Sequence, residues 1–292
     1  MCTGPVLMIP LRDNIPSRST PVVNFVMIGI CGLVFAAQLM EPQDDATLVE
    51  RFGMIPVRVL HPSQPVEIPY AQERTGEYQL RRLPSGEVVK VPVVRTLKRE
   101  AAQSPLPAWT TLLTCIFLHG GWMHFIGNMW FLWIFGDNVE DRFGHTGYLL
   151  FYLAAGVAAS LSHLVSASGS PVPTIGASGA IAGVMGAYLI SYPHARVQAL
   201  LPIGFIMQIL VVPAPVFLGI WMLMQLVQGV SSITAVETTG VAWWAHIGGF
   251  AAGAAVAWLL DKAHFLRPKN PVIRPGTDHM THYRIRRGPY GR

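Results

Sequence analysis

Charged side chains are scarce in this chain of 292 residues: Asp, Glu, Lys and Arg together make up 13% of it, while 51% is hydrophobic. A soluble domain carries roughly 25% charged residues, so this deficit excludes an ordinary soluble globular protein and predicts a polytopic membrane protein. Cysteine is scarce as well. Cys2, Cys31 and Cys115 are odd in number and widely separated, which excludes a disulfide framework and a cysteine metal site.

Acidic residues are outnumbered by basic ones, and the net charge is +5. Such a charge could indicate a nucleic-acid-binding protein, but its position in the sequence argues against that class. Eight of the 21 Lys and Arg residues follow residue 261, immediately after the last apolar stretch. Lysine and arginine collect in this way on the cytoplasmic side of membrane helices, so the charge indicates topology and no nucleic-acid partner is expected.

Six apolar stretches have the composition of membrane-spanning helices. They run from Pro21 to Met40 and then, approximately, over 122–135, 147–165, 178–192, 213–229 and 241–260. The sequence therefore predicts an all-α, six-helix bundle in the lipid bilayer, with a long extramembrane loop between its first two helices. The apolar run 197–212 ends at a proline and is interpreted as an interfacial lead-in to the fifth span.

Residues 41–108 form an insertion of different composition, with nine acidic residues, nine basic residues and no spanning segment. Tyr78 to Val94 is typical of two short strands around the turn Pro84-Ser85-Gly86, although Pro92 weakens the second strand. Nothing in the insertion indicates chemistry of its own. We expect a small extracytoplasmic hairpin subdomain.

The distribution of basic residues predicts the orientation of the bundle. If the N-terminal segment 1–20 is cytoplasmic and 21–40 is the first span, the short inner segments and the basic tail 262–292 hold 12 Lys and Arg residues. The outer loops near 166–177 and 230–240 hold none. Both termini are therefore predicted to be cytoplasmic. The loop 230–240 is expected to form a cap on the outer side.

The fourth span begins with a serine between glycines, in the tetrapeptide Gly176-Ala177-Ser178-Gly179. Glycine lets backbone and ligand approach the hydroxyl closely. A serine hydroxyl is a weak nucleophile until a base removes its proton, and the predicted topology brings His246 of the sixth span to the same depth. The same pattern also suits plain packing of small residues between helices, which is the alternative interpretation.

Further polar residues lie at this depth, because the second span begins with His124 and Asn128 on one helix face. Polar side chains within spans are expensive and usually face the bundle interior. A nucleophile, a base and two donors thus gather in the outer leaflet, which predicts an active site. A metal site of His119, His124, His163 and His246 is an alternative, but no acidic or cysteine ligand accompanies them, so neither metal nor cofactor is expected.

These motifs resemble those of the rhomboid intramembrane serine proteases. The resemblance rests on Gly-Ala-Ser-Gly, on Ala245-His246-x-x-Gly249-x-x-x-Gly253, on His119-x4-His124-x3-Asn128 and on Glu140-x-Arg142-x-Gly144. It implies a catalytic core over about 109–261 and, with the first span, the six-helix bacterial form in a bacterial inner membrane. The insertion 41–108 has no counterpart in the resemblance.

The resemblance also implies a role for each site residue. Ser178 would be the nucleophile and His246 the general base, in a dyad without a carboxylate. The oxyanion would be received by Asn128, His124 and the backbone N–H of Ser178, with support from His119, Gly176 and Gly179. One position departs from the family: some members carry a tyrosine packed on the histidine four residues after the serine, and here that residue is Ala182.

The function implied is that of a serine endopeptidase that cleaves the spans of other membrane proteins near their extracytoplasmic ends. Transmembrane proteins would be its substrates, and no oligomeric state is indicated. A non-catalytic relative that binds client membrane helices is the main alternative, although such a protein would usually have lost Ser178 or His246. A small-solute carrier would require an inverted repeat, and none is evident in the sequence.

Overall fold

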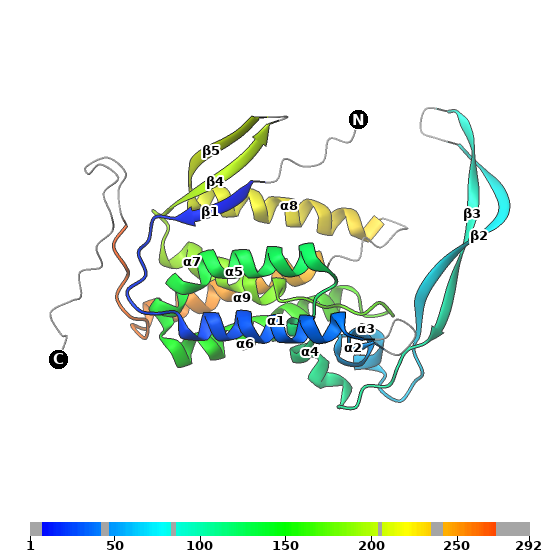
Figure 1. Cartoon of the computed structure of the whole chain (residues 1–292), viewed down its shortest axis with the longest axis horizontal. Helices are drawn as coiled ribbons and strands as arrows, with labels where there is room; N and C mark the ends of the chain where they lie inside the picture. The colour runs from blue at the N-terminus through cyan, green and yellow to red at the C-terminus, as the bar shows by residue number, and fades with distance from the viewer. Residues whose placement is uncertain (1–7, 42–46, 83–85, 204–205, 235–241, 273–292) are drawn as a thin grey trace.

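The computed structural model describes residues 8–41, 47–82, 86–203, 206–234 and 242–272. Most of the predicted turn 84–86, most of the predicted cap over 230–240 and most of the basic tail lie outside these residues. The main body of the described chain is a group of long helices lying side by side (Figure 1). They are α1 Val22–Leu39, α5 Trp122–Phe143, α6 His145–Ser166, α7 Ser178–Ser191, α8 Ala214–Thr234 and α9 Trp243–Lys262.

Each of these helices coincides with one of the predicted spans. Among the described residues, α1, α6, α8 and α9 are long and apolar enough to cross a membrane, and α7 is a shorter apolar helix. Helix α5 continues to Phe143, beyond the predicted end of the second span near residue 135. The predicted span excludes the last two turns of this helix because they are polar, with acidic residues at 137, 140 and 141. The protein is therefore mostly helical, and the six-span arrangement remains a prediction.

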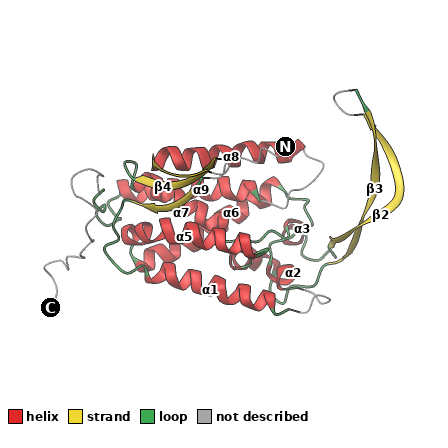
Figure 2. Ribbon diagram, turned by 45° about the horizontal axis from the view of Figure 1, so that its top comes forward, coloured by secondary structure: helices red, strands yellow, loops and turns green. Residues whose placement is uncertain are grey.

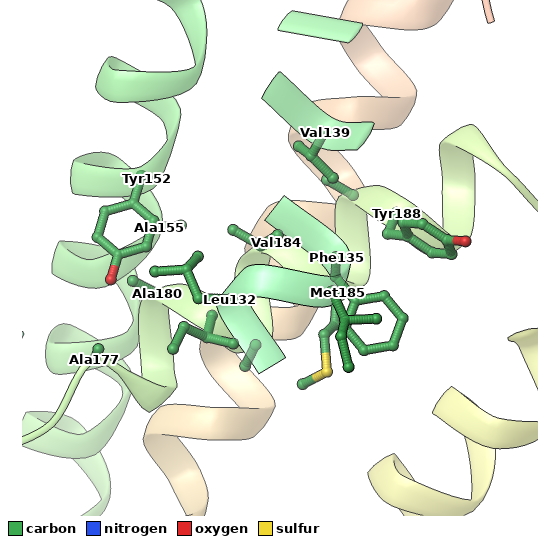
Figure 3. Packing of buried hydrophobic residues seen from close by; sticks show 14 of the residues in the cluster. Leu132, Phe135, Val139, Tyr152, Ala155, Ala177, Ala180, Val184, Met185 and Tyr188 are labelled. Carbon is green, nitrogen blue, oxygen red and sulfur yellow. The ribbon is translucent and has the colours of Figure 1, made fainter. Parts of the chain in front are cut away.

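Helix α7 lies at the centre of the bundle, and from Gly179 to Tyr188 every residue is buried. It can be enclosed in this way because its small residues let neighbouring backbones come close. A Cβ atom at Gly186 would lie 2.2 Å from the backbone oxygen of Phe250 in α9, and one at Gly183 would lie 2.6 Å from Cβ of Ala155 in α6. Larger side chains from α5 and α6 fill the remaining space (Figure 3).

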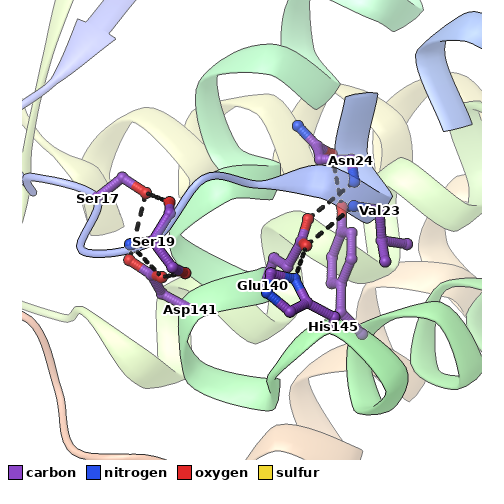
Figure 4. A network of polar contacts seen from close by, with 8 residues as sticks. Ser17, Ser19, Val23, Asn24, Glu140, Asp141 and His145 are labelled. Atoms are coloured by element: carbon purple, nitrogen blue, oxygen red, sulfur yellow. Dashed lines mark hydrogen bonds and ion pairs between the residues drawn. The ribbon is translucent and has the colours of Figure 1, made fainter. Parts of the chain in front are cut away.

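A polar network near the C-terminal end of α5 connects this helix to its neighbours (Figure 4). The Glu140 carboxylate accepts hydrogen bonds from the backbone N–H groups of Val23 (3.0 Å) and Asn24 (2.8 Å), at the positively polarised N-terminus of α1. Arg142 forms an ion pair with Asp261 at the end of α9. The motif that contains these two residues thus joins α5 to α1 and α9.

Two sheets accompany the helices, so the prediction of an all-α fold was wrong (Figure 2). Strands β1 Ile9–Asp13, β4 Arg196–Ile203 and β5 Ile206–Pro213 form an antiparallel sheet in the order β1-β4-β5. The run 197–212 is thus a hairpin rather than an interfacial lead-in. The apolar sequence of this run fits a strand as well as a membrane-surface segment. The third strand of the sheet, β1, pairs with β4 but lies far away in the sequence, so the sheet was not predicted.

The insertion contains the second sheet, a hairpin of β2 Glu67–Arg82 and β3 Val88–Glu100 that projects from the bundle (Figure 1). Two strands were predicted here, but the observed ones are longer. Pro92 lies within β3, opposite Tyr78. Both strands of a two-stranded ribbon are edge strands. An edge strand tolerates proline, because the backbone N–H that proline lacks need not bond to another strand.

The base of the insertion is compact. Helices α2 Leu48–Phe52 and α3 Pro56–Leu60 precede the hairpin, and Ile55, Val66, Ile68 and Ala101 form a small separate core there. The Glu50 carboxylate forms an ion pair with Arg99 and holds the two ends of the insertion together. The chain then reaches α5 through the short helices η1 Ala108–Thr110, α4 Thr111–Thr114 and η2 Cys115–Phe117.

Candidate active site

Ser178 is the first residue of α7, and the backbone that leads to it requires glycine. Gly176 has a φ angle of +124°, in a region that L side chains rarely adopt. A Cβ atom at Gly176 would lie 2.6 Å from Nε2 of His124 and 3.6 Å from Oγ of Ser178. Glycine is therefore needed at this position both for the turn and for the space that the two side chains share.

His246 lies in the first turn of α9, and its Nε2 atom is 2.7 Å from Oγ of Ser178. The close packing of α7 and α9 produces this approach. A Cβ atom at Gly249 would lie 2.1 Å from the backbone oxygen of Gly179, so the two helices touch through their backbones one turn beyond the pair. The structure thus brings the predicted nucleophile and base into direct hydrogen-bond contact.

The other side of the His246 ring faces α8. Its Nδ1 atom lies 2.7 Å from Oε1 of Gln225, and the Trp221 ring lies 5.9 Å from the imidazole, centroid to centroid. Gln225 was not among the site residues predicted from the sequence. Its signal was present, since an amide in the middle of an apolar span is costly unless it has a partner. The spacing alone could not say that the partner is a histidine on another helix.

The two predicted oxyanion donors are on one face of α5, one turn apart. Nδ1 of His124 accepts a hydrogen bond from the backbone N–H of Gly120 at 3.2 Å, which leaves Nε2, the atom beside Gly176, as the donor of the neutral ring. Asn128 is 8% exposed, and its Nδ2 group has no hydrogen-bond partner among the described residues. A buried donor without a partner is unusual and suits a site that binds an anion only transiently.

His119 lies beside these donors without joining the Ser178–His246 pair. Its ring is buried against Phe35, Phe125 and His124. The side chain of Gln38 bonds to both the N–H and the C=O of His119, at 3.0 Å each, and fixes the loop before α5. This geometry suits the supporting role predicted for His119. No cluster of three or more potential metal ligands occurs in the described part of the chain.

The base of the insertion contacts the segment that leads to Ser178. Met54 and Thr174 form a two-way backbone bridge, with N···O distances of 3.0 and 2.8 Å. The hydroxyl of Thr114 donates to the backbone oxygen of Phe52 at 2.6 Å. Although no chemistry was predicted for the insertion, its base helps to fix the position of the serine loop.

Comparison with known proteins identifies the family. A family model described as the Rhomboid domain matches residues 107–263. Rhomboid-like protein 11, chloroplastic, from Arabidopsis thaliana is 31% identical over 173 residues, or 58% of this chain and 59% of the relative. Rhomboid protease GluP from Bacillus subtilis (strain 168) is 47% identical over 81 residues, 28% of this chain and 15% of the relative.

A third relative, Rhomboid protein 1, mitochondrial, from Saccharomyces cerevisiae (strain ATCC 204508 / S288c), is 27% identical over 158 residues, or 52% of this chain and 42% of its own length. The chain thus spans less than two thirds of the length of each of these relatives. The Rhomboid model, however, covers more than half of the chain, including both members of the serine–histidine pair. The chain therefore belongs to the rhomboid family and is a membrane protein.

Proposed function

We propose that this protein is an intramembrane serine endopeptidase that cleaves transmembrane segments of other membrane proteins. The observation that carries the proposal is the contact of 2.7 Å between Nε2 of His246 and Oγ of Ser178. A hydroxyl that donates to a neutral imidazole is poised to lose its proton during nucleophilic attack. Membership of a family that includes a named protease supports the same activity.

The residues present are sufficient for acyl transfer. Nε2 of His246 takes the proton from Ser178 as Oγ attacks the peptide carbonyl carbon. The resulting oxyanion accepts hydrogen bonds from Asn128 Nδ2, from His124 Nε2–H and from the backbone N–H of Ser178. The C–N bond then breaks, His246 gives its proton to the leaving amine, and a water molecule hydrolyses the ester by the same steps.

The proposal includes six membrane spans. Four helices are long and apolar enough to cross a membrane, and α5 and α7 are proposed to be the other two spans. The burial of α7 supports a sixth span, because a helix enclosed by other helices does not face lipid and can be shorter and less apolar than one that does. The scarcity of Lys and Arg near the start of α7 supports an outer-leaflet site with both termini in the cytoplasm. A bacterial inner membrane is part of the proposal: GluP is a bacterial relative, while the other two relatives named above are chloroplastic and mitochondrial.

The shape of the site favours particular substrates. A peptide bond within a stable transmembrane helix is already hydrogen-bonded, so only a segment that unwinds near the outer end exposes its carbonyl to Ser178. Glycine or proline there lowers the cost of unwinding. A residue before the cut must also fit beside Gly176 and Gly179, which favours a small side chain. We therefore expect cuts near the extracytoplasmic ends of substrate spans.

The alternative of a non-catalytic binder of client helices would not require the contact between Ser178 and His246. The test uses the protein in liposomes with a model transmembrane substrate and a fluorophosphonate probe. Wild type is expected to cleave and to be labelled, and Ser178→Ala to do neither. Ser191→Ala, at the far end of the same helix, is the matched control and should retain both. Cleavage by Ser178→Ala above background would refute the proposal.

A further inference from the structure

The His246 ring has two nitrogens, and the proposed reaction uses only one of them. In a dyad without a carboxylate, something else must select the tautomer in which Nε2 is free to accept a proton. The tyrosine that packs on the histidine in some relatives is replaced here by Ala182, which is fully buried and carries no functional group. The orienting group therefore has to come from another helix.

We propose that Gln225 of α8 is the positioning residue of His246, an inference that rests on the proposed function. Its Oε1 atom lies 2.7 Å from Nδ1 of His246, and the residue is only 6% exposed. Burying an amide in an apolar helix is unfavourable unless the amide is hydrogen-bonded. The contact with the imidazole provides that bond at Nδ1, the ring nitrogen that Ser178 does not contact.

The chemistry of the amide determines the direction of the effect. An amide oxygen can only accept a hydrogen bond, so Nδ1 of His246 must carry the proton. The lone pair then resides on Nε2 and points at the Ser178 hydroxyl, 2.7 Å away. When the ring gains a second proton during attack, the same oxygen still accepts from Nδ1, and the bond becomes charge-assisted and stronger.

Trp221 adds a steric constraint from the same helix. It precedes Gln225 by four residues, so both side chains project from one face of α8 toward His246. The Trp221 and His246 rings lie 5.9 Å apart with an interplanar angle of 40°, and the Trp243 ring of α9 lies 6.1 Å from the imidazole at 87°. The aromatic rings restrict where the imidazole can lie, and Gln225 selects how it is protonated.

The test compares three variants in the full-length protein. Gln225→Met keeps the length of the side chain but replaces the amide oxygen with a thioether sulfur, which accepts only weakly. Gln225→Glu keeps an acceptor oxygen at the same reach, and Gln228→Leu removes an exposed amide from the same helix. Gln225→Met should lower kcat about 10- to 100-fold at unchanged KM, because a hydrogen bond to the charged ring is lost. Gln225→Glu should recover most of that loss, and Gln228→Leu should match wild type.

The rate of fluorophosphonate labelling and the midpoint of thermal unfolding are measured on the same samples. Gln225→Met should be labelled more slowly while unfolding at the wild-type temperature or above. A wild-type kcat in Gln225→Met, or an activity in Gln225→Glu no higher than in Gln225→Met, would overturn the assignment of Gln225 while leaving the proposed function intact. A wild-type protein that neither cleaves nor is labelled would instead overturn the proposed function itself.

Discussion

Replacing Asn128 separates a catalytic donor from a packing residue more sharply than any other change in the site. The Nδ2 group of Asn128 is buried without a partner among the described residues. Leaving a polar group unsatisfied costs roughly 1–3 kcal/mol, and the folded protein bears that cost before any substrate arrives. Removal of one donor from a preorganised oxyanion site costs about 3–4 kcal/mol in the transition state, or 10²–10³ in kcat. Asn128→Leu should therefore lower kcat by about that factor without lowering stability.

The assay measures kcat and KM for a model transmembrane substrate in liposomes, and the midpoint of thermal unfolding in detergent. For Asn128→Leu we expect a large fall in kcat, a nearly unchanged KM and an unfolding temperature equal to or above that of wild type. Asn128→Asp, which keeps the shape but brings a negative charge toward the oxyanion, should be at least as inactive. A rise in KM alone, or a loss of activity that follows a loss of stability, would show that Asn128 is a packing residue.

Three further changes test other parts of the structure. His124→Ala should lower kcat about tenfold, less than Asn128→Leu, because His124 is partly exposed and water can replace its ring donor, whereas Asn128 is buried. Replacing residues 71–97 by a short Gly/Ser turn should leave cleavage of a minimal substrate unchanged, since the small core at the base of the insertion remains; loss of cleavage in a folded protein would contradict this. Asp13→Asn should raise stability by about 1–3 kcal/mol at pH 7.5 and not at pH 4, as followed by thermal unfolding, because burial raises the pKa of Asp13 to about 6. The folded state then holds a proton that the unfolded chain releases between about pH 4 and 6, so stability falls as the pH rises through that window.

The helices could be predicted from the sequence because the thickness of a bilayer fixes the length of an apolar span. The pairing of Ser178 with His246 could be predicted as well, since topology put the two residues at one depth and the motifs resembled those of one family. Both inferences depend on local patterns and on a simple count of membrane crossings. Neither requires knowledge of which helices touch.

The parts that could not be predicted depend on contacts between distant segments. The run 197–212 becomes a hairpin beside β1, and pairs such as Ile9 with Leu200 join segments that are far apart in the chain. Gln225 is a similar case, because its meaning depends on the ring that it meets. A lone glutamine in a span indicates a buried partner but does not identify it.

Backbone packing and side-chain contacts together explain how Ser178 and His246 can be held in place without a carboxylate. Contacts between α7 and α9 continue along both helices, since a Cβ atom at Gly253 would lie 2.0 Å from the backbone oxygen of Gly183, as at Gly249 and Gly179. Backbones in such contact cannot come closer without a clash, so packing between the two helices fixes the minimum separation between the Cα atoms of Ser178 and His246. Only the rotation and protonation of the imidazole remain free: Trp221 of α8 and Trp243 of α9 restrict its rotation, and by our proposal Gln225 of α8 selects its protonation.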